Sequence, residues 1–186
     1  MAARIEPLMT VEDLDAMPDD GNRYEVIEGE LFVSRAPGLP HQIVSGNFHY
    51  QIRIYLETNP IGTIVATPGL VLSRYNGVIP DLVFYTHKHA EQIIANDRLI
   101  AAPDIVIEIL SPGRENISRD RIAKRQLYAK YGVKEYWIAD SENRSVEIYR
   151  LTDKGLELAA MLRLGDEITS PLLPGFSCSR SKIFES

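Results

Sequence analysis

The sequence has little cysteine, no long hydrophobic run and no apolar stretch near its start. Its 186 residues include one cysteine, Cys178, which excludes an intrachain disulfide framework and a zinc site made of cysteines alone. No segment approaches the roughly 18 consecutive apolar residues that a membrane-spanning helix needs. The first residues also lack the apolar segment of a secretory signal. These absences predict a cytoplasmic protein with no membrane partner.

Several common catalytic signatures are also absent. The chain contains no Walker phosphate loop, no G-x-G-x-x-G fingerprint, no G-x-S-x-G nucleophile elbow and no H-E-x-x-H zinc motif. Nucleotide-dependent and serine-hydrolase activities therefore have no residues to carry them.

The charge is acidic overall but unevenly distributed. The chain is 45% hydrophobic and 25% charged, with a net charge of −6, which argues against binding nucleic acid by bulk electrostatics alone. Residues 113–134 carry seven bases and two acids, or +5, which leaves −11 for the rest. A locally basic surface on an acidic body is compatible with an anionic ligand at one place. The alternative interpretation is a solvated helix face.

Hydrophobic spacing predicts a mixed α/β fold in one domain over residues 1–186. Apolar residues at helical spacing predict an amphipathic helix over 41–57 and a second helix over 118–131 that ends at Gly132. Residues 1–38 are predicted to form a helix and β-hairpin extension of a core over 39–186. Strands are predicted over 63–66, 70–73, 79–85, 103–110, 135–140 and 145–149, with short strands after them. Helices then flank a mixed central sheet.

Acidic residues in apolar strands are the strongest candidates for chemistry. Glu108 lies between two isoleucines, where an ionised carboxylate is costly unless it is paired or binds a cation. Asp104 shares strand parity with Glu108, and Asp81 follows Pro80 on another predicted strand. Carboxylates that converge from neighbouring strands form a hard oxygen site suited to Mg²⁺ or Mn²⁺. Alternatively, Asp81 and Asp104, each after a proline, cap the starts of strands.

The second predicted helix places a lysine at the edge of its inward face. Asp120, Lys124 and Tyr128 recur there at intervals of four. The simpler interpretation is a solvent-exposed Asp120–Lys124 pair, worth about 0.3–0.5 kcal/mol. The alternative directs the ammonium group at the metal site. Spacing alone favours the exposed pair.

The histidines give weaker signals. His41 opens the helix over 41–57, which could dock over the site. His49 lies eight residues further on, about 12 Å along a helix axis, too far to share one ion with His41. His87 and His89 could bind zinc from one face of a strand, but no third ligand is apparent, so zinc is a minor alternative.

Four stretches of the sequence resemble one known family. They are YEVIEGEL (24–31), PDLVF (80–84), PDIVIEILSP (103–112) and DRIAKRQLYAKYGVKEYWIAD (120–140). Pro40-His41 also matches the usual start of the family's long helix. On these residues the chain resembles, over nearly its whole length, the Uma-type restriction endonuclease family of the PD-(D/E)XK nuclease superfamily.

The resemblance implies a restriction-endonuclease-like fold and a divalent ion, Mg²⁺ or Mn²⁺. Asp81 and Glu108 would hold this ion, together with a strand carbonyl such as that of Ile109. The superfamily pattern has a lysine two residues after the glutamate, where this sequence has Leu110. The family is thought to supply the amine from the next helix, which here means Lys124. Asp81, Glu108 and Lys124 are therefore the predicted catalytic residues.

The same resemblance predicts supporting residues and a substrate. Asp104, His41 and Tyr128 are possible accessory residues. Basic side chains of the second helix would contact phosphates near the scissile one: Arg119, Arg121, Arg125 and Lys130. The predicted activity is hydrolysis of phosphodiester bonds in DNA. A homodimer is expected because two sites related by symmetry cut two strands more easily.

Two other functions stay open at this point. One is a nucleic-acid-binding module that keeps the fold without the chemistry, because fold alone does not guarantee activity. The other is a structural or regulatory protein whose acidic strands stabilise a dimer. A divalent ion between Asp81 and Glu108 favours the nuclease, and DNA binding without turnover favours the binding module. A sheet end buried at a subunit contact, without metal or DNA binding, favours the third function.

Overall fold

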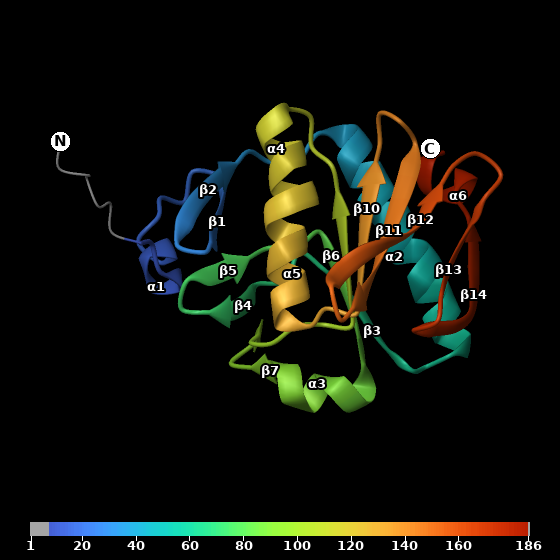
Figure 1. Ribbon diagram of the computed structural model, residues 1–186, viewed down its shortest axis with the longest axis horizontal. Helices are drawn as coiled ribbons and strands as arrows, with labels where there is room; N and C mark the ends of the chain where they lie inside the picture. The colour runs from blue at the N-terminus through green and yellow to red at the C-terminus, as the bar shows by residue number, and fades with distance from the viewer. Residues whose placement is uncertain (1–7, 186) are drawn as a thin grey trace.

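A central sheet of six strands organises the molecule (Figure 1). The structure is a computed structural model that describes residues 8–185. The strand order is β12 (Gly155–Leu162), β11 (Ser145–Thr152), β10 (Glu135–Asp140), β9 (Ile105–Ile109), β6 (Leu82–Thr86) and β3 (Gly62–Ala66). Strands β9 and β10 are parallel, and the other neighbours are antiparallel. The mixed sheet expected from the sequence is confirmed.

Helix α2 (Leu39–Thr58) covers one face of this sheet. Its residues Val44, Phe48, Ile52 and Leu56 are buried at the spacing that predicted the helix over 41–57. They belong to one apolar cluster with the odd-numbered isoleucines of β9, residues 105–109. The spacing of the apolar residues in this helix therefore identifies the face that packs on the sheet.

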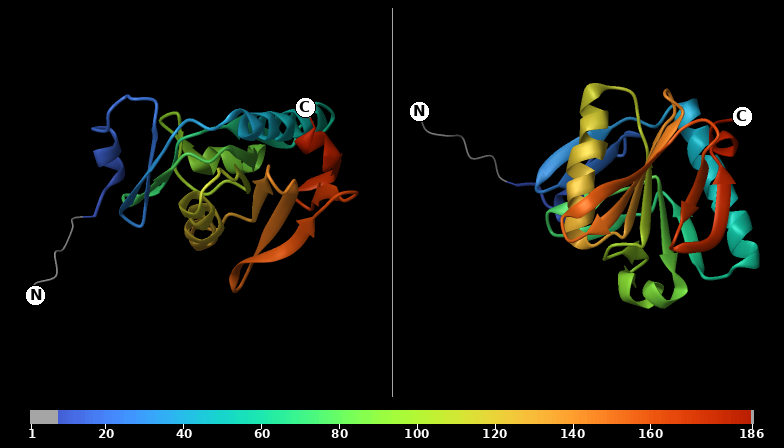
Figure 2. Two further views of the ribbon diagram at one scale, coloured as in Figure 1. Left: turned by 90° about the horizontal axis from the view of Figure 1, so that it is seen from above. Right: turned by 45° about the vertical axis from the view of Figure 1, so that its right-hand side comes forward.

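A second long helix covers the opposite face, as the left view of Figure 2 shows. It comprises α4 (Arg114–Ser118), a π-helical turn η1 (Arg119–Lys124) and α5 (Arg125–Tyr131), and is called the α4–α5 helix below. Gly132 ends it with φ +88°, the left-handed cap that the sequence predicts. Leu127 and Tyr128 pack with the apolar residues of that sheet face. The π turn is a feature the sequence did not predict, and such turns are frequent at functional sites.

The N-terminal hairpin belongs to a second sheet. The strand order there is β2 (Glu30–Ser34), β1 (Arg23–Ile27), β5 (Asn76–Val78), β4 (Leu70–Ser73), β8 (Arg98–Leu99) and β7 (Ile94–Ala95). The join between β1 and β5 pairs Val26 with Gly77. The hairpin is thus tied to strands between α2 and β9, and this pairing places its side chains near the α4–α5 helix.

The remaining elements are short. Helix α1 (Val11–Leu14) is the helix expected in the N-terminal extension, and it begins with a capping box formed by Thr10 and Asp13. Helix α3 (His87–Ile93) follows β6 and leads into β7 and β8. Strands β13 (Glu167–Ser170) and β14 (Leu173–Ser179) pair with each other, and α6 (Ser181–Phe184) follows. Within residues 8–185 no helix is both long and apolar enough to cross a membrane.

Candidate active site

Asp81 and Glu108 face each other across two adjacent strands. The β6–β9 ladder pairs Leu82 with Ile107, so one step further along this register Asp81 lies opposite Glu108. The Asp81 N–H donates to Glu108 Oε2 at 3.3 Å, and the Ile109 N–H donates to Asp81 Oδ2 at 2.9 Å. Pro80, which lacks an N–H, precedes Asp81, and β6 begins at residue 82 rather than at 79 as expected. At this end of the two strands, carboxylate oxygens therefore accept the backbone N–H groups of Asp81 and Ile109 in place of backbone carbonyls.

The α4–α5 helix brings an amine and a hydroxyl to Glu108. Lys124 Nζ and Tyr128 Oη each lie 2.9 Å from Glu108 Oε1. Lys124 is 2% exposed, and Asp120 is equally buried, with its Oδ1 3.9 Å from Nζ. The solvent-exposed Asp120–Lys124 pair that spacing alone favoured is therefore wrong, because this side of the helix lies against the end of the sheet.

The hairpin contributes two residues that the sequence did not identify. Glu25 Oε1 lies 2.9 Å from Lys124 Nζ and accepts the Ile79 N–H at 2.8 Å. Arg23 Nη1 donates to Asp81 Oδ1 at 3.2 Å. The sequence offered one indication of their position. Alternate residues of a strand point to the same face, so Arg23 and Glu25 share a face with the apolar Ile27. Their partners, however, depend on the distant β1–β5 pairing.

Arg119 and the Tyr136 hydroxyl close the cluster around Asp120. Arg119 Nε donates to Asp120 Oδ1 at 3.1 Å, and its Nη1 lies 4.0 Å from Glu25 Oε2. The Tyr136 hydroxyl donates to the backbone carbonyl of Asp120 at 3.0 Å. The carboxylate cluster, as we call Glu25, Asp81, Glu108 and Asp120, thus shares three cations: Arg23, Arg119 and Lys124.

His41, at the start of α2, joins the cluster from the other side of the sheet. Its Nε2 lies 3.0 Å from Asp81 Oδ2. Its Nδ1 is buried and has no hydrogen-bond partner among the described residues. An unmet buried polar atom is costly, so it needs a partner such as bound water or substrate.

The charges of the cluster oppose one another, with consequences for each pKa. Burial raises the pKa of Glu108, while the ammonium of Lys124 opposes this rise and favours the carboxylate form. Burial alone would lower the pKa of Lys124, but Glu108, Glu25 and Asp120 together raise it above its usual value. For Asp81, burial is outweighed by His41 and the Ile109 N–H, which lower its pKa. Lys124 is therefore an ammonium donor, and Asp81 is a carboxylate.

The donor set at the strand ends fits Mg²⁺. Asp81, Glu108 and Ile109 are among the residues that line a cavity of about 20 Å³, room for roughly one water-sized species. The described residues hold no group of three or more histidine, cysteine or acidic side chains suited to a metal. Mg²⁺ is commonly bound through only one or two carboxylates, completed by waters and substrate phosphates. Two facing carboxylates satisfy that requirement.

Asp104 lies apart from the cluster despite sharing strand parity with Glu108. Its carboxylate accepts the Thr86 N–H at 2.8 Å and lies 2.6 Å from Lys134 Nζ and 3.2 Å from His89 Nδ1. Asp104 precedes β9 whereas Glu108 is near the end of it, so the two occupy opposite ends of the strand. The structure therefore gives Asp104 the strand-start role and does not bring it to the site.

The histidine pair proposed for zinc lies on a helix. His87 and His89 are the first and third residues of α3, where positions two apart point in different directions. The expected strand, with both side chains on one face, is therefore wrong.

The basic residues expected to contact phosphates have partners inside the protein. Arg121 pairs with Glu147 at 2.6 Å, and Lys130 pairs with Glu28 at 2.9 Å. Arg125 stacks its guanidinium 5.0 Å from the centre of the Tyr149 ring. Among the four, only Arg119 lines the cavity of the cluster. The positive charge of this window is therefore largely compensated by acids that lie far away in the sequence.

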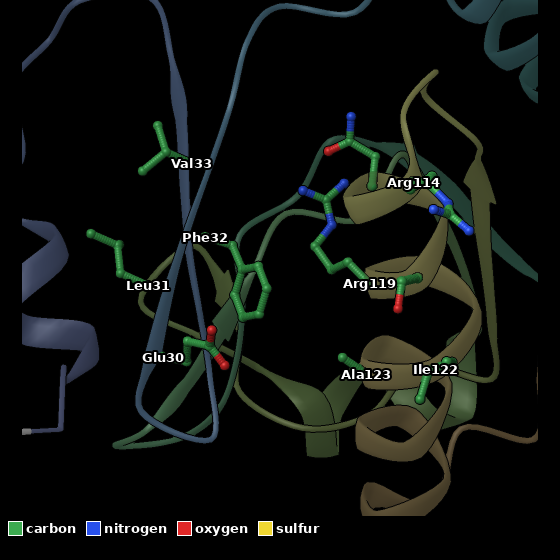
Figure 3. Close-up of a pocket in the computed structure, with 10 residues that line it drawn as sticks. Glu30, Leu31, Phe32, Val33, Arg114, Arg119, Ile122 and Ala123 are labelled. Carbon is green, nitrogen blue, oxygen red and sulfur yellow. The ribbon is translucent and has the colours of Figure 1, made fainter.

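A larger groove lies beside the carboxylate cluster, between β2 and the α4–α5 helix (Figure 3). Its volume is about 770 Å³. Figure 3 shows the Phe32 ring pointing from β2 toward the helix, with the Arg119 guanidinium in the gap above it. Arg119 lines both this groove and the cavity of the cluster, so the two spaces are neighbours.

A mixed sheet between helices, with paired carboxylates where two adjacent strands end, defines a restriction-endonuclease-like architecture. The comparison with known families agrees, because the model of the Uma2 family, described as "Putative restriction endonuclease", matches residues 11–181. The chain belongs to this family, as its motifs suggested.

One solved structure shows the same fold, and a second gives a weaker partial match. A putative nuclease of the DUF820 family from Anabaena variabilis aligns with a TM-score of 0.75 at 17% identity, covering 95% of this chain and 97% of that one. The type IIG restriction endonuclease BpuSI aligns with a TM-score of 0.43 at 11% identity, covering 68% of this chain and 14% of that one. No curated protein matches the chain.

Proposed function

We propose that this protein is a metal-dependent endonuclease that hydrolyses phosphodiester bonds in DNA. One observation carries the proposal: Asp81 and Glu108 meet at the ends of adjacent strands, with Lys124 on Glu108. An anionic cluster so deeply buried is expensive for a merely structural device. Membership of the Uma2 family supports the same reaction class.

Each residue of the site has a proposed role. Asp81 and Glu108 would hold Mg²⁺ or Mn²⁺ through carboxylate oxygens, with the Ile109 carbonyl as a third protein ligand. Such an ion supplies a more acidic bound water and neutralises charge on the scissile phosphate. Lys124, kept as an ammonium by Glu108 and Glu25, stabilises negative charge that develops on the phosphate.

Three further residues position this machinery. Tyr128 fixes Glu108 through its hydroxyl, and Arg23 and His41 fix Asp81 from two directions. The unmet Nδ1 of His41 is a further polar atom for water or substrate. These residues orient the carboxylates, which is the usual task of groups around metal ligands.

The test is nicking of supercoiled plasmid with Mg²⁺, with Mn²⁺ and with a chelator. Asp81→Asn and Glu108→Gln keep the side-chain shape and should each reduce metal-dependent nicking by at least about a hundredfold. Asp104→Asn is the matched control, because Asp104 is an equally buried carboxylate outside the cluster. Nicking at the wild-type rate by both cluster variants would end the proposal and indicate a contaminating nuclease.

The ion pairing itself favours one alternative, a nucleic-acid-binding module without turnover. Lys124 is already bound to both Glu25 and Glu108, so the cluster is close to internally satisfied. The same plasmid, used in a binding assay, separates the two functions. Saturable DNA binding with no nicking under any metal condition selects the binding module.

The homodimer expected from two-strand cleavage stays a prediction. Light scattering coupled to gel filtration tests it with the wild-type chain. A mass near twice the 20.9 kDa of one chain is the expected result.

A further inference from the structure

A second, cation-rich pocket lies along the same edge of the central sheet. Its volume is about 610 Å³. We call it the arginine pocket, because four arginines line it: Arg121, Arg144, Arg163 and Arg180. Asp140 at the end of β10 also lines it, and the parallel pairing of Ala139 with Ile109 puts this strand end beside the carboxylate cluster. In Figure 1 the arrows of β9 and β10 point to the same upper edge, where α6 also lies.

The two carboxylates of the arginine pocket are already engaged. Glu147 accepts from Arg121 at 2.6 Å and from the Tyr149 hydroxyl at 2.5 Å. Asp140 accepts the N–H groups of residues 142 and 143 and the side chain of Asn143. Four arginines and two acids leave a net charge of +2 in the lining.

The other three arginines have no acidic partner within residues 8–185. No carboxylate there forms an ion pair with Arg144, Arg163 or Arg180. Among the residues that the structure describes, the Arg144 side chain donates only to the Phe184 carbonyl, at 2.9 Å. Arg163 and Arg144 are both exposed, so their charges face solvent at the pocket.

Arg180 is the observation that points to a ligand. It is 6% exposed, and its Nε has no hydrogen-bond partner among the described residues. Its Nη1 donates to the Arg144 carbonyl, and the guanidinium lies 5.5 Å from the centre of the Phe184 ring. A buried cation with an unmet donor is costly. An anion with several acceptor oxygens would supply both the charge and the acceptor.

We propose that the arginine pocket binds a phosphate of the nucleic-acid backbone that flanks the scissile phosphate. The identity of the ligand rests on the proposed nuclease function. Neighbouring strands are about 4.8 Å apart, so β11 lies about 10 Å from β9. A DNA strand carries a phosphate every ~3.4 Å of helix axis, so one strand can reach both sites at once. Arg121 and Lys124, three residues apart on the π turn, connect them.

The first arm measures binding of a fluorescent 20-base-pair duplex without divalent ions, over a range of salt. The test variant is Arg144→Asn with Arg163→Gln, since both side chains are exposed and asparagine tolerates the φ of +49° at position 144. We expect roughly tenfold weaker binding at 0.1 M salt and a log–log salt slope smaller by about 1–2. Arg180 is left unchanged, because its burial couples any substitution to folding.

Arg53→Gln is the matched control. Arg53 is an exposed arginine on α2, twelve residues or about 18 Å along the helix from His41. Arg53→Gln removes one positive charge away from the pocket, half the change made in the double variant, and should change neither the affinity by more than about twofold nor the salt slope. Equal binding by the wild type and the double variant overturns the proposal.

A second arm separates a backbone phosphate from a free anion. Thermal unfolding is measured in inorganic phosphate and in chloride at equal ionic strength. A phosphate-dependent rise in Tm that the double variant loses, together with its weaker DNA binding, supports the proposal. The same rise with unchanged DNA binding overturns it in favour of a free phosphate ion.

Cleavage kinetics distinguish failure of this proposal from failure of the nuclease function. If both are right, the double variant has a raised KM and a kcat within about twofold of the wild type. If the wild type cleaves DNA and the double variant has the same KM, the proposal for the arginine pocket is overturned and the nuclease function stands. A wild type that binds through the pocket without cleaving overturns the nuclease function alone, and one that binds no DNA overturns both.

Discussion

Lys124 Nζ and Glu108 Oε1 lie 2.9 Å apart, both almost fully buried, although 16 residues separate them in the chain. The side chain two residues after Glu108 is Leu110, which packs in the apolar cluster beneath the α4–α5 helix. The amine near the glutamate therefore comes from that helix instead of from the strand. Its π turn ends at Lys124.

Removing this amine should lower the free energy of unfolding. Lys124→Met leaves Glu25, Glu108 and Asp120 buried without their shared cation, which costs about 3–5 kcal/mol for a broken buried pair. Urea denaturation gives the free energy of unfolding. Lys130→Met is the control, because the exposed Lys130–Glu28 pair contributes little. Equal stability of the two variants would contradict the structural role of Lys124.

Asp104 should stabilise the fold without serving the reaction. Asp104→Asn removes a carboxylate bound to Lys134 and to the Thr86 N–H, and we expect a loss of about 1–3 kcal/mol at pH 7. Nicking of plasmid by the folded variant should match the wild type. If the Asp104→Asn variant keeps full stability but loses nicking, Asp104 acts in the active site and this prediction is wrong.

The stabilisation by Asp104 should depend on pH. Burial opposes ionisation, but Lys134, the Thr86 N–H and His89 lower the pKa of Asp104 below its model-peptide value of 3.8. The unfolded chain thus takes up this proton at a higher pH than the folded chain. The stabilisation is complete above about pH 5 and is lost as the pH falls through the folded pKa. The stability gap between the wild type and Asp104→Asn should therefore narrow between pH 5 and pH 3 in urea titrations.

Cys178 should be unreactive in the native protein. It is 1% exposed, and burial raises the pKa of its thiol to about 11. A thiol reagent at pH 8 should react at least about a hundredfold more slowly with native protein than with protein in guanidinium, because the thiolate is the nucleophile. Rapid native labelling would show that β14 opens readily or packs differently.

Local patterns predicted the parts of the site that depend on one element at a time. The spacing from Val44 to Leu56 fixed the inward face of α2, which brings His41 to the sheet edge. An acid between isoleucines marked Glu108, because apolar surroundings force a carboxylate to find partners. The choice of Lys124 came from family resemblance, since its spacing equally fits an exposed pair.

Features that depend on distant partners could not be predicted in this way. Glu25 reaches Lys124 only because β1 joins β5, some 50 residues away in the chain. Arg121, on the α4–α5 helix, is paired with Glu147 on β11, so counting bases in a window overestimates the free positive charge. The arginine pocket combines residues from β11, β12 and the chain after β14, which no local window contains.

The most direct test of the central claim is titration of Mn²⁺ into the wild-type chain, followed by calorimetry or by the electron paramagnetic resonance of free Mn²⁺. We predict saturable binding that Asp81→Asn and Glu108→Gln each weaken strongly and Asp104→Asn leaves unchanged. Binding that persists unaltered in both cluster variants, or a wild type that binds no Mn²⁺, would contradict a metal site at Asp81 and Glu108.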